Sequence, residues 1–201
     1  MMADPSATRG SRLRFPVRTA RLTLRPFASR DLVDLLDIFG RPEVVRFLYT
    51  DVWHADTAPE LLDGKAACVR WASEGDTLVL AIVPDVEDRV VGEVVLTWRS
   101  EKHRQGEIGF VVHPHATGRG YAREAAAAML RIGFETLGLH RIYGRCDARN
   151  HASARVMEKL RMRREAHLVN DEWFKGEWSD TLVYAMLETE WRRVDPPPPP
   201  C

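Results

Sequence analysis

The stretch His113–Ala126, HPHATGRGYAREAA, decides how this sequence folds. It follows Ile108–Val112, an apolar run that predicts a buried strand, and it leads into Tyr121–Leu137, where apolar residues recur at helical spacing. A strand, a short glycine loop and a helix direct successive backbone N–H groups at an anion, and the helix dipole favours a phosphate there. Gly118 and Gly120 let the backbone approach that phosphate closely.

Charge and composition exclude several classes of partner. The chain has 201 residues, with 29 Lys and Arg against 29 Asp and Glu, so its formal net charge is zero. A neutral chain has no overall field that attracts nucleic acid or an anionic membrane, and neither is expected as a partner. No apolar run reaches the length of about 18 residues that a membrane helix needs, and the first residues, MMADPSATRGSR, do not read as a signal peptide. We therefore expect a cytoplasmic protein. The 3 cysteines and 7 histidines show no metal-binding spacing, and no metal is expected.

Hydrophobic periodicity divides the chain into a polar tail (residues 1–14), one domain (residues 15–193) and a proline-rich stub (residues 194–201). Within the domain, a first strand is expected over Arg18–Pro26, where Leu22 and Leu24 alternate with polar residues. Further strands are expected over Thr77–Val83, Val90–Trp98, Gln105–His113, Arg141–Asp147, Arg164–Phe174 and Glu177–Leu187. Helical spacing predicts helices after Ser29 and over Thr57–Ala72, Tyr121–Leu137 and Asn150–Leu160.

The glycine loop resembles the pyrophosphate loop of one enzyme family. It lacks the Gly-Lys-Ser/Thr of a P-loop, and Arg123 stands where a dinucleotide fingerprint needs a small residue. Residues 115–120, His-Ala-Thr-Gly-Arg-Gly, resemble the Gln/Arg-x-x-Gly-x-Gly/Ala pattern of the GNAT N-acetyltransferases, with His115 departing from it at the first position. An ordinary strand-to-helix turn is the alternative, which the motif further along the chain disfavours. The resemblance implies that coenzyme A contacts His115, Thr117, Gly118, Arg119, Gly120, Tyr121 and Ala122.

A second motif lies in the segment Asn150–Leu160, NHASARVMEKL. It resembles the N-x-x-S-x-x-V-x-x-K-L segment of the RimJ/RimL-type subfamily, whose members modify ribosomal protein N-termini. The resemblance implies that Asn150 binds the pantetheine chain and that Ser153 lies near it, one helical turn on. The alternative is purely structural: Asn150 would be the N-cap of a helix and Ser153 its N3 residue.

The resemblance also implies an α/β (α+β) fold, covering about residues 17–191. We expect the GNAT fold: a single mixed, mostly antiparallel sheet of about seven strands, flanked by helices on both faces, with splayed central strands. The strands Gln105–His113 and Arg141–Asp147 would separate at one end. Unpaired amides at Phe110, Val111 and Val112 would then bind the pantetheine arm as a peptide adds to a sheet edge, and one of them would polarise the thioester carbonyl.

Acetyl transfer to an amine also needs a base and a proton for the departing thiolate. Many relatives carry a tyrosine seven residues after the asparagine as the acid, but here that position is Met157. The role passes to Ser153, to a water or to no essential group. Glu107 is the candidate base, because a carboxylate inside a central strand has no packing purpose; a charge at an exposed strand edge is the alternative. Asp180 is the other candidate carboxylate.

In relatives the first two helices line the acceptor pocket, and Trp53 and His54 follow them here, either to contact substrate or to pack. The expected function is an acetyl-CoA-dependent N-acetyltransferase, with acetyl-CoA as cosubstrate. Its acceptor is a primary amine, either a protein N-terminal amine or a small molecule. The alternative is a non-catalytic acyl-CoA-binding sensor or interaction module on the same fold. Relatives are often homodimers, and this sequence leaves the oligomeric state open.

Overall fold

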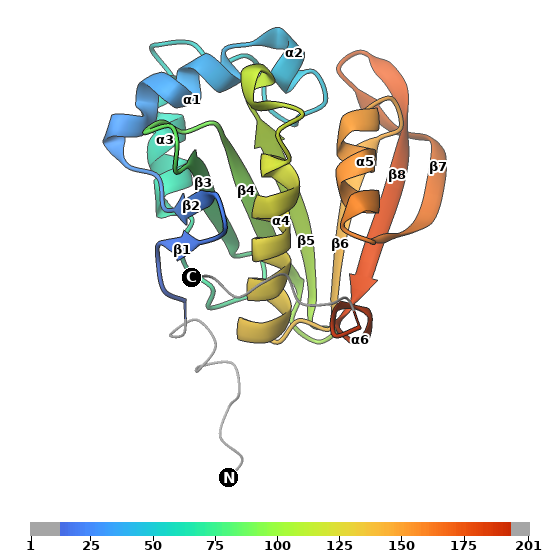
Figure 1. Ribbon diagram of the computed structural model, residues 1–201. Coiled ribbons are helices and arrows are strands. Elements are labelled where there is room, and N and C mark those ends of the chain that lie inside the picture. The colour runs from blue at the N-terminus through green and yellow to red at the C-terminus, as the bar shows by residue number, and fades with distance from the viewer. Residues whose placement is uncertain (1–12, 194–201) are drawn as a thin grey trace.

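The computed structural model describes residues 13–193 and contains one sheet of eight strands in the order β1-β2-β3-β4-β5-β6-β8-β7 (Figure 1). Helices cover both faces, so the expected mixed sheet between two helical layers is confirmed. Most of the predicted tail, and the whole of the predicted stub 194–201, lie outside the described residues. Within the described part, no helix is long and apolar enough to cross a membrane, and no three His, Cys, Asp or Glu side chains form a group able to hold a metal ion.

The strands are β1 (Val17–Arg18), β2 (Leu22–Arg25), β3 (Thr77–Pro84), β4 (Gly92–Ser100), β5 (Gln105–Val112), β6 (Arg141–Asp147), β7 (Arg163–Phe174) and β8 (Glu177–Leu187). The helices are α1 (Leu32–Phe39), α2 (Pro42–Val45), α3 (Ala58–Ala67), α4 (Tyr121–Arg131), α5 (His151–Lys159) and α6 (Glu188–Trp191).

Three boundaries differ from the sequence-based expectation. The strand expected over Arg18–Pro26 is two strands, because Thr19 and Leu22 exchange hydrogen bonds that turn the chain between β1 and β2. The α3 helix stops at Ala67, since the carbonyl of Cys68 is used by the amide of Val79 in β3 at 2.8 Å. The long helix ends its α-helical part at Arg131 and continues as a π-helical turn.

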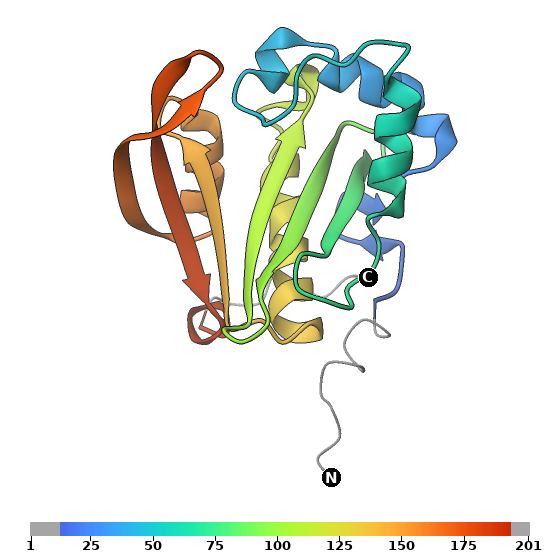
Figure 2. The same cartoon turned by 180° about the vertical axis from the view of Figure 1, so that it is seen from behind.

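The two faces of the sheet carry separate cores, as the alternation along β3 shows. Leu78, Leu80 and Ile82 pack into the core beneath α4 and α5, which lie in front of the sheet in Figure 1. Val79 and Ala81 point to the opposite face and pack under α1 and α3, which Figure 2 shows from behind. A fully buried strand of this kind is apolar on both faces.

The two central strands β5 and β6 separate, as expected. They pair in parallel only from Gln105 opposite Arg141 to Glu107 opposite Tyr143. Beyond Glu107, β6 keeps its antiparallel ladder with β8 over its whole length, while β5 keeps its ladder with β4. The edge of β5 from residue 108 to residue 112 therefore faces β6 without a partner strand, and the strands diverge there in Figure 2.

Candidate active site

The glycine loop presents its main chain to an anion. Gly118 and Gly120 have φ of +79° and +83°, which glycine adopts without the penalty that a side chain brings. Gly120 is the N-cap of α4, whose first amides have no carbonyl partner inside the helix. Among the described residues, none accepts a hydrogen bond from the amides of residues 118–120. Several N–H groups at one helix N-terminus thus remain available for a phosphate.

The side chains of this loop bind the protein itself. Arg119 forms an ion pair with Glu87 at 2.6 Å, and the ring of His115 lies 3.5 Å from the same carboxylate. The hydroxyl of Thr117 donates to the carbonyl of Pro114. These contacts explain why histidine is compatible with the first position of the motif: the side chain fixes the loop to Glu87, and the main chain remains for the ligand.

The peptide groups of β5 alternate in direction. The amide of His113, just after β5, donates to the carbonyl of Val91, just before β4, at 2.7 Å, so this N–H group points to the β4 side. Successive N–H groups along a strand of an antiparallel ladder point alternately to the partner strand and away from it. Phe110 and Val112 therefore direct their N–H groups to the open side, whereas Val111 directs its own to β4. This corrects the expectation for Val111, which is not an amide donor to a ligand in the split.

A cavity of about 260 Å³ lies where β5 and β6 part. Its walls come from β4, β5, β6, the α2–α3 connection and the first turns of α5. It brings together six of the residues that the sequence singled out: Glu107, Phe110, Val111, Asn150, Ser153 and Met157. Since the glycine loop follows directly on β5, one continuous edge leads from the loop to this cavity.

The segment that begins α5 caps its helix and also lines the cavity. The side-chain oxygen of Asn150 accepts a hydrogen bond from the amide of Ser153 at 3.1 Å, so Asn150 is the N-cap of the helix. Asn150 and Ser153 also line the cavity. The cap uses the main chain of Ser153, which leaves its hydroxyl outside the capping interaction.

Because the cap uses the amide of Ser153 and not its hydroxyl, two substitutions should have different effects. Ser153→Ala retains the cap, so we expect an unchanged melting temperature and a turnover lowered by roughly ten- to a hundredfold if the hydroxyl assists the departing sulfur. Asn150→Ala removes the cap and should lower the free energy of unfolding by about 1 kcal/mol. Thermal unfolding and thiol release, measured on both variants, check this. Normal turnover of Ser153→Ala would contradict the catalytic role.

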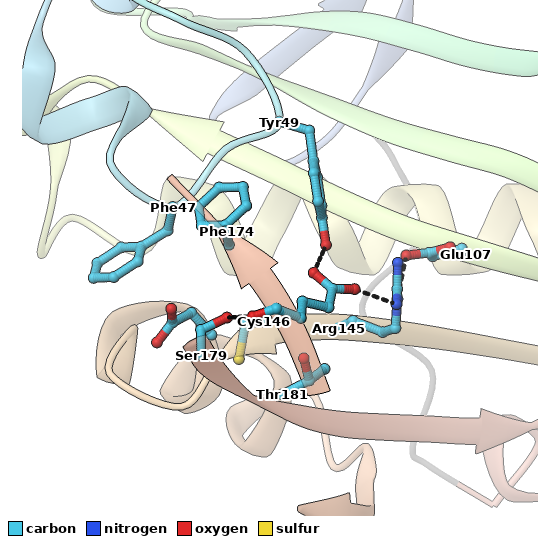
Figure 3. Close-up of a pocket in the computed structure, with 10 residues that line it drawn as sticks. Phe47, Tyr49, Glu107, Arg145, Cys146, Phe174, Ser179 and Thr181 are labelled. Carbon is cyan, nitrogen blue, oxygen red and sulfur yellow. Dashed lines mark hydrogen bonds and ion pairs between the residues drawn. The ribbon is translucent and has the colours of Figure 1, made fainter. Parts of the chain in front are cut away.

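Glu107 belongs to a chain of charged groups that crosses the split. Its carboxylate accepts a hydrogen bond from Nε of Arg99 at 2.7 Å and lies 3.3 Å from Nε of Arg145. Arg145 also reaches Glu172 on β7 at 3.0 Å, and the hydroxyl of Tyr49 donates to Glu172. Figure 3 shows Tyr49, Arg145 and Glu107 converging on a second, smaller cavity of about 60 Å³. Glu107 is 17% exposed, so it is neither buried in apolar surroundings nor free in solvent.

Sequence reasoning missed Tyr49, Arg99, Arg145 and Glu172. They stand on four separate segments, and no motif links them. The sequence carries little signal for them: β7 is polar along most of its length, and β6 already carries other charged residues.

The three acceptor candidates lie elsewhere. The Trp53 ring is 4% exposed and stacks on Phe39 at 4.7 Å, so it packs in the core. His54 is exposed, and neither it nor Trp53 lines either of the two cavities. Asp180 accepts a hydrogen bond from the amide of Asn170 and contacts His167 at 2.7 Å, and it lines neither of the two cavities. The amide first and the histidine second lower the pKa of Asp180 below its usual range.

Cys146 on β6 lines both cavities, and burial raises the pKa of its thiol to about 11. Only the thiolate reacts with alkylating agents, and an ordinary cysteine has a pKa of about 8.5. We expect iodoacetamide to modify Cys146 roughly a hundredfold more slowly at pH 8 than a free cysteine, with the rate rising towards pH 11. Acetyl-CoA should slow the reaction further. Peptide mass spectrometry of the treated protein checks both effects, and rapid labelling at pH 7 would contradict them.

Comparison with known proteins gives a consistent result. The acetyltransferase (GNAT) domain matches residues 21–163. The uncharacterized N-acetyltransferase YnaD of Bacillus subtilis is 33% identical over 175 residues, which cover 87% of this chain and 98% of YnaD. Two solved structures share the fold at lower identity. The spermidine N-acetyltransferase of Vibrio cholerae, in complex with CoA and spermine, has a TM-score of 0.73 at 20% identity and covers 87% of this chain and 100% of its own. RimL, a ribosomal alpha-N-protein acetyltransferase in complex with coenzyme A, has a TM-score of 0.74 at 16% identity. The alignment covers 87% of this chain and 98% of RimL.

Proposed function

The chain belongs to the GNAT acetyltransferase family, and from this premise we propose that it transfers the acetyl group of acetyl-CoA to a primary amine by direct attack. The observation that carries the proposal is the cavity at the β5–β6 split. It joins an open strand edge, the Asn150–Ser153 cap and the carboxylate of Glu107 in one space, at the end of a loop suited to pyrophosphate.

Main-chain amides bind the coenzyme, and two side chains transfer protons. The amides at the start of α4 bind the pyrophosphate, and the outward amides of Phe110 and Val112 bind the pantetheine arm and polarise the thioester carbonyl. Glu107 takes a proton from the acceptor ammonium, and the resulting neutral nitrogen forms a bond to the acetyl carbon. As the carbon–sulfur bond breaks, the nitrogen loses its second proton, and this proton reaches the thiolate through the hydroxyl of Ser153 or through water. A thiolate is a good leaving group, so a weak acid suffices in place of the tyrosine that Met157 replaces.

The acceptor distinguishes two versions of the proposal. The RimJ/RimL-type motif supports a protein N-terminal amine, whereas the fold shared with the spermidine enzyme supports a small amine. Thiol release from acetyl-CoA should be measured with peptides that begin with Ser, Ala or Leu and with a panel of small amines. We expect saturable release with one of these groups.

A negative control is built into the same assay. The Glu107→Gln variant should bind acetyl-CoA by calorimetry and release little thiol. If the unmodified chain binds acetyl-CoA tightly and releases no thiol with any amine, the enzyme assignment fails and the acyl-CoA sensor replaces it.

A further inference from the structure

Arg145 stands at the point where the central sheet opens. The last pair of the β5–β6 ladder joins Glu107 to Tyr143, and Arg145 is two residues further along β6, on the same face as Tyr143. Its guanidinium reaches back across the split to Glu107, so a side-chain ion pair takes over where the backbone ladder stops. Figure 3 shows the two side chains facing each other over the small cavity.

Arg145 is shared between two carboxylates. Nε lies 3.3 Å from Oε1 of Glu107, and Nη1 lies 3.0 Å from Oε1 of Glu172. The other oxygen of Glu107, Oε2, is held by Arg99 at the shorter distance of 2.7 Å. Both oxygens of Glu107 are therefore occupied by cations, and the Arg145 contact is the longer of the two.

An acceptor ammonium needs one of those oxygens. If it displaced Arg99, that arginine would lose the one carboxylate that it contacts among the described residues. If it displaced Arg145, that arginine would keep Glu172. The contact of Arg145 with Glu107 is also the longer of the two, 3.3 Å against 2.7 Å, so the exchange at Oε1 is the less costly one.

We propose that Arg145 is a positioning residue for the reaction: it orients the Glu107 carboxylate in the empty cleft and yields Oε1 to the incoming ammonium while it stays paired with Glu172. This role rests on the proposed function. It assigns Arg99 as the permanent clamp on Oε2 and Oε1 as the atom that receives the proton of the amine.

The test uses Arg145→Met, which keeps an unbranched chain of similar length and removes the charge. A misplaced base costs roughly a hundredfold in rate for a shift of about 1 Å, so we expect kcat to fall by roughly ten- to a hundredfold. The KM for the acceptor should not rise, since a competing cation has been removed, and the acetyl-CoA Kd should stay the same. In a second variant, Arg145→Ala, which leaves the position of the guanidinium group open, millimolar guanidinium should restore part of kcat.

Two further variants separate positioning from a structural role. In a Glu107→Gln background, Arg145→Met should cause no further loss of kcat, because the group that it orients is already gone. Arg141→Met is the matched control: Arg141 lies on the same strand, forms an ion pair with Glu165 at 2.6 Å, and lines neither cavity. Its kcat should equal that of the unmodified chain.

Three results would overturn the role of Arg145 alone: kcat of Arg145→Met within twofold of the unmodified chain, an equal loss in the Glu107→Gln background, or no response of Arg145→Ala to guanidinium. Absence of thiol release by the unmodified chain with every amine would overturn the proposed function, and the role of Arg145 with it. The two failures are thus told apart by the activity of the unmodified chain.

Discussion

Glu107→Gln is expected to lower kcat by roughly 100- to 10,000-fold, which is the contribution of a positioned general base. The substitution keeps the size of the side chain and removes the group that accepts the proton. Glu107 lies on the same sheet face as Thr97 and lines both cavities, beside the point where β5 loses its partner strand. The acetyl-CoA Kd, measured by calorimetry, should change by less than threefold, because the coenzyme contacts assigned above are main-chain amides and α5.

Asp180→Asn is the matched control, since Asp180 is the other carboxylate that the sequence proposed. Its position in the hairpin of β7 and β8, bound to Asn170 and His167, keeps it outside both cavities. We expect turnover close to that of the unmodified chain. If Asp180→Asn abolished turnover and Glu107→Gln did not, the assignment of the base would be reversed.

Gly120→Val should raise the acetyl-CoA Kd by about a hundredfold or more. A β-branched residue is strained at φ +83°, so the loop must change its conformation to accept it. A shift that breaks two hydrogen bonds between amides and a charged phosphate costs about 1.5 to 3 kcal/mol for each. Calorimetric titration with acetyl-CoA measures the effect directly.

Gly138→Val controls for the backbone strain. Gly138 has φ of +68°, no neighbouring atom lies within 4 Å of the position that its Cβ would take, and it follows the π-helical turn rather than the loop. Both variants should lose a similar amount of stability, and only Gly120→Val should lose coenzyme affinity. An unchanged Kd for Gly120→Val would remove the phosphate assignment.

Local patterns predicted most of the fold. The apolar run Thr77–Pro84 and the apolar run before the glycine loop each depend on residues close in sequence, and the structure has a strand at both places. Helix ends were less predictable. The end of α3 depends on a hydrogen bond from Val79 to Cys68, eleven residues away, which no periodicity encodes. Trp53 shows the same limit, because its burial against Phe39 depends on how α1 meets the following loop.

The sequence by itself determined strand β5, the glycines Gly118 and Gly120, helix α4 and the cap that joins Asn150 to Ser153. Each of these is a short-range pattern governed by backbone geometry or by the needs of a helix terminus. Only the tertiary structure decided which charges meet Glu107. Arg99, Arg145 and Glu172 come from strands that are separated in the chain and brought together by the sheet, and their pairing depends on where β6 leaves β5 to follow β8. That divergence is a property of the whole sheet, because each strand keeps the neighbour with which it forms the longer ladder.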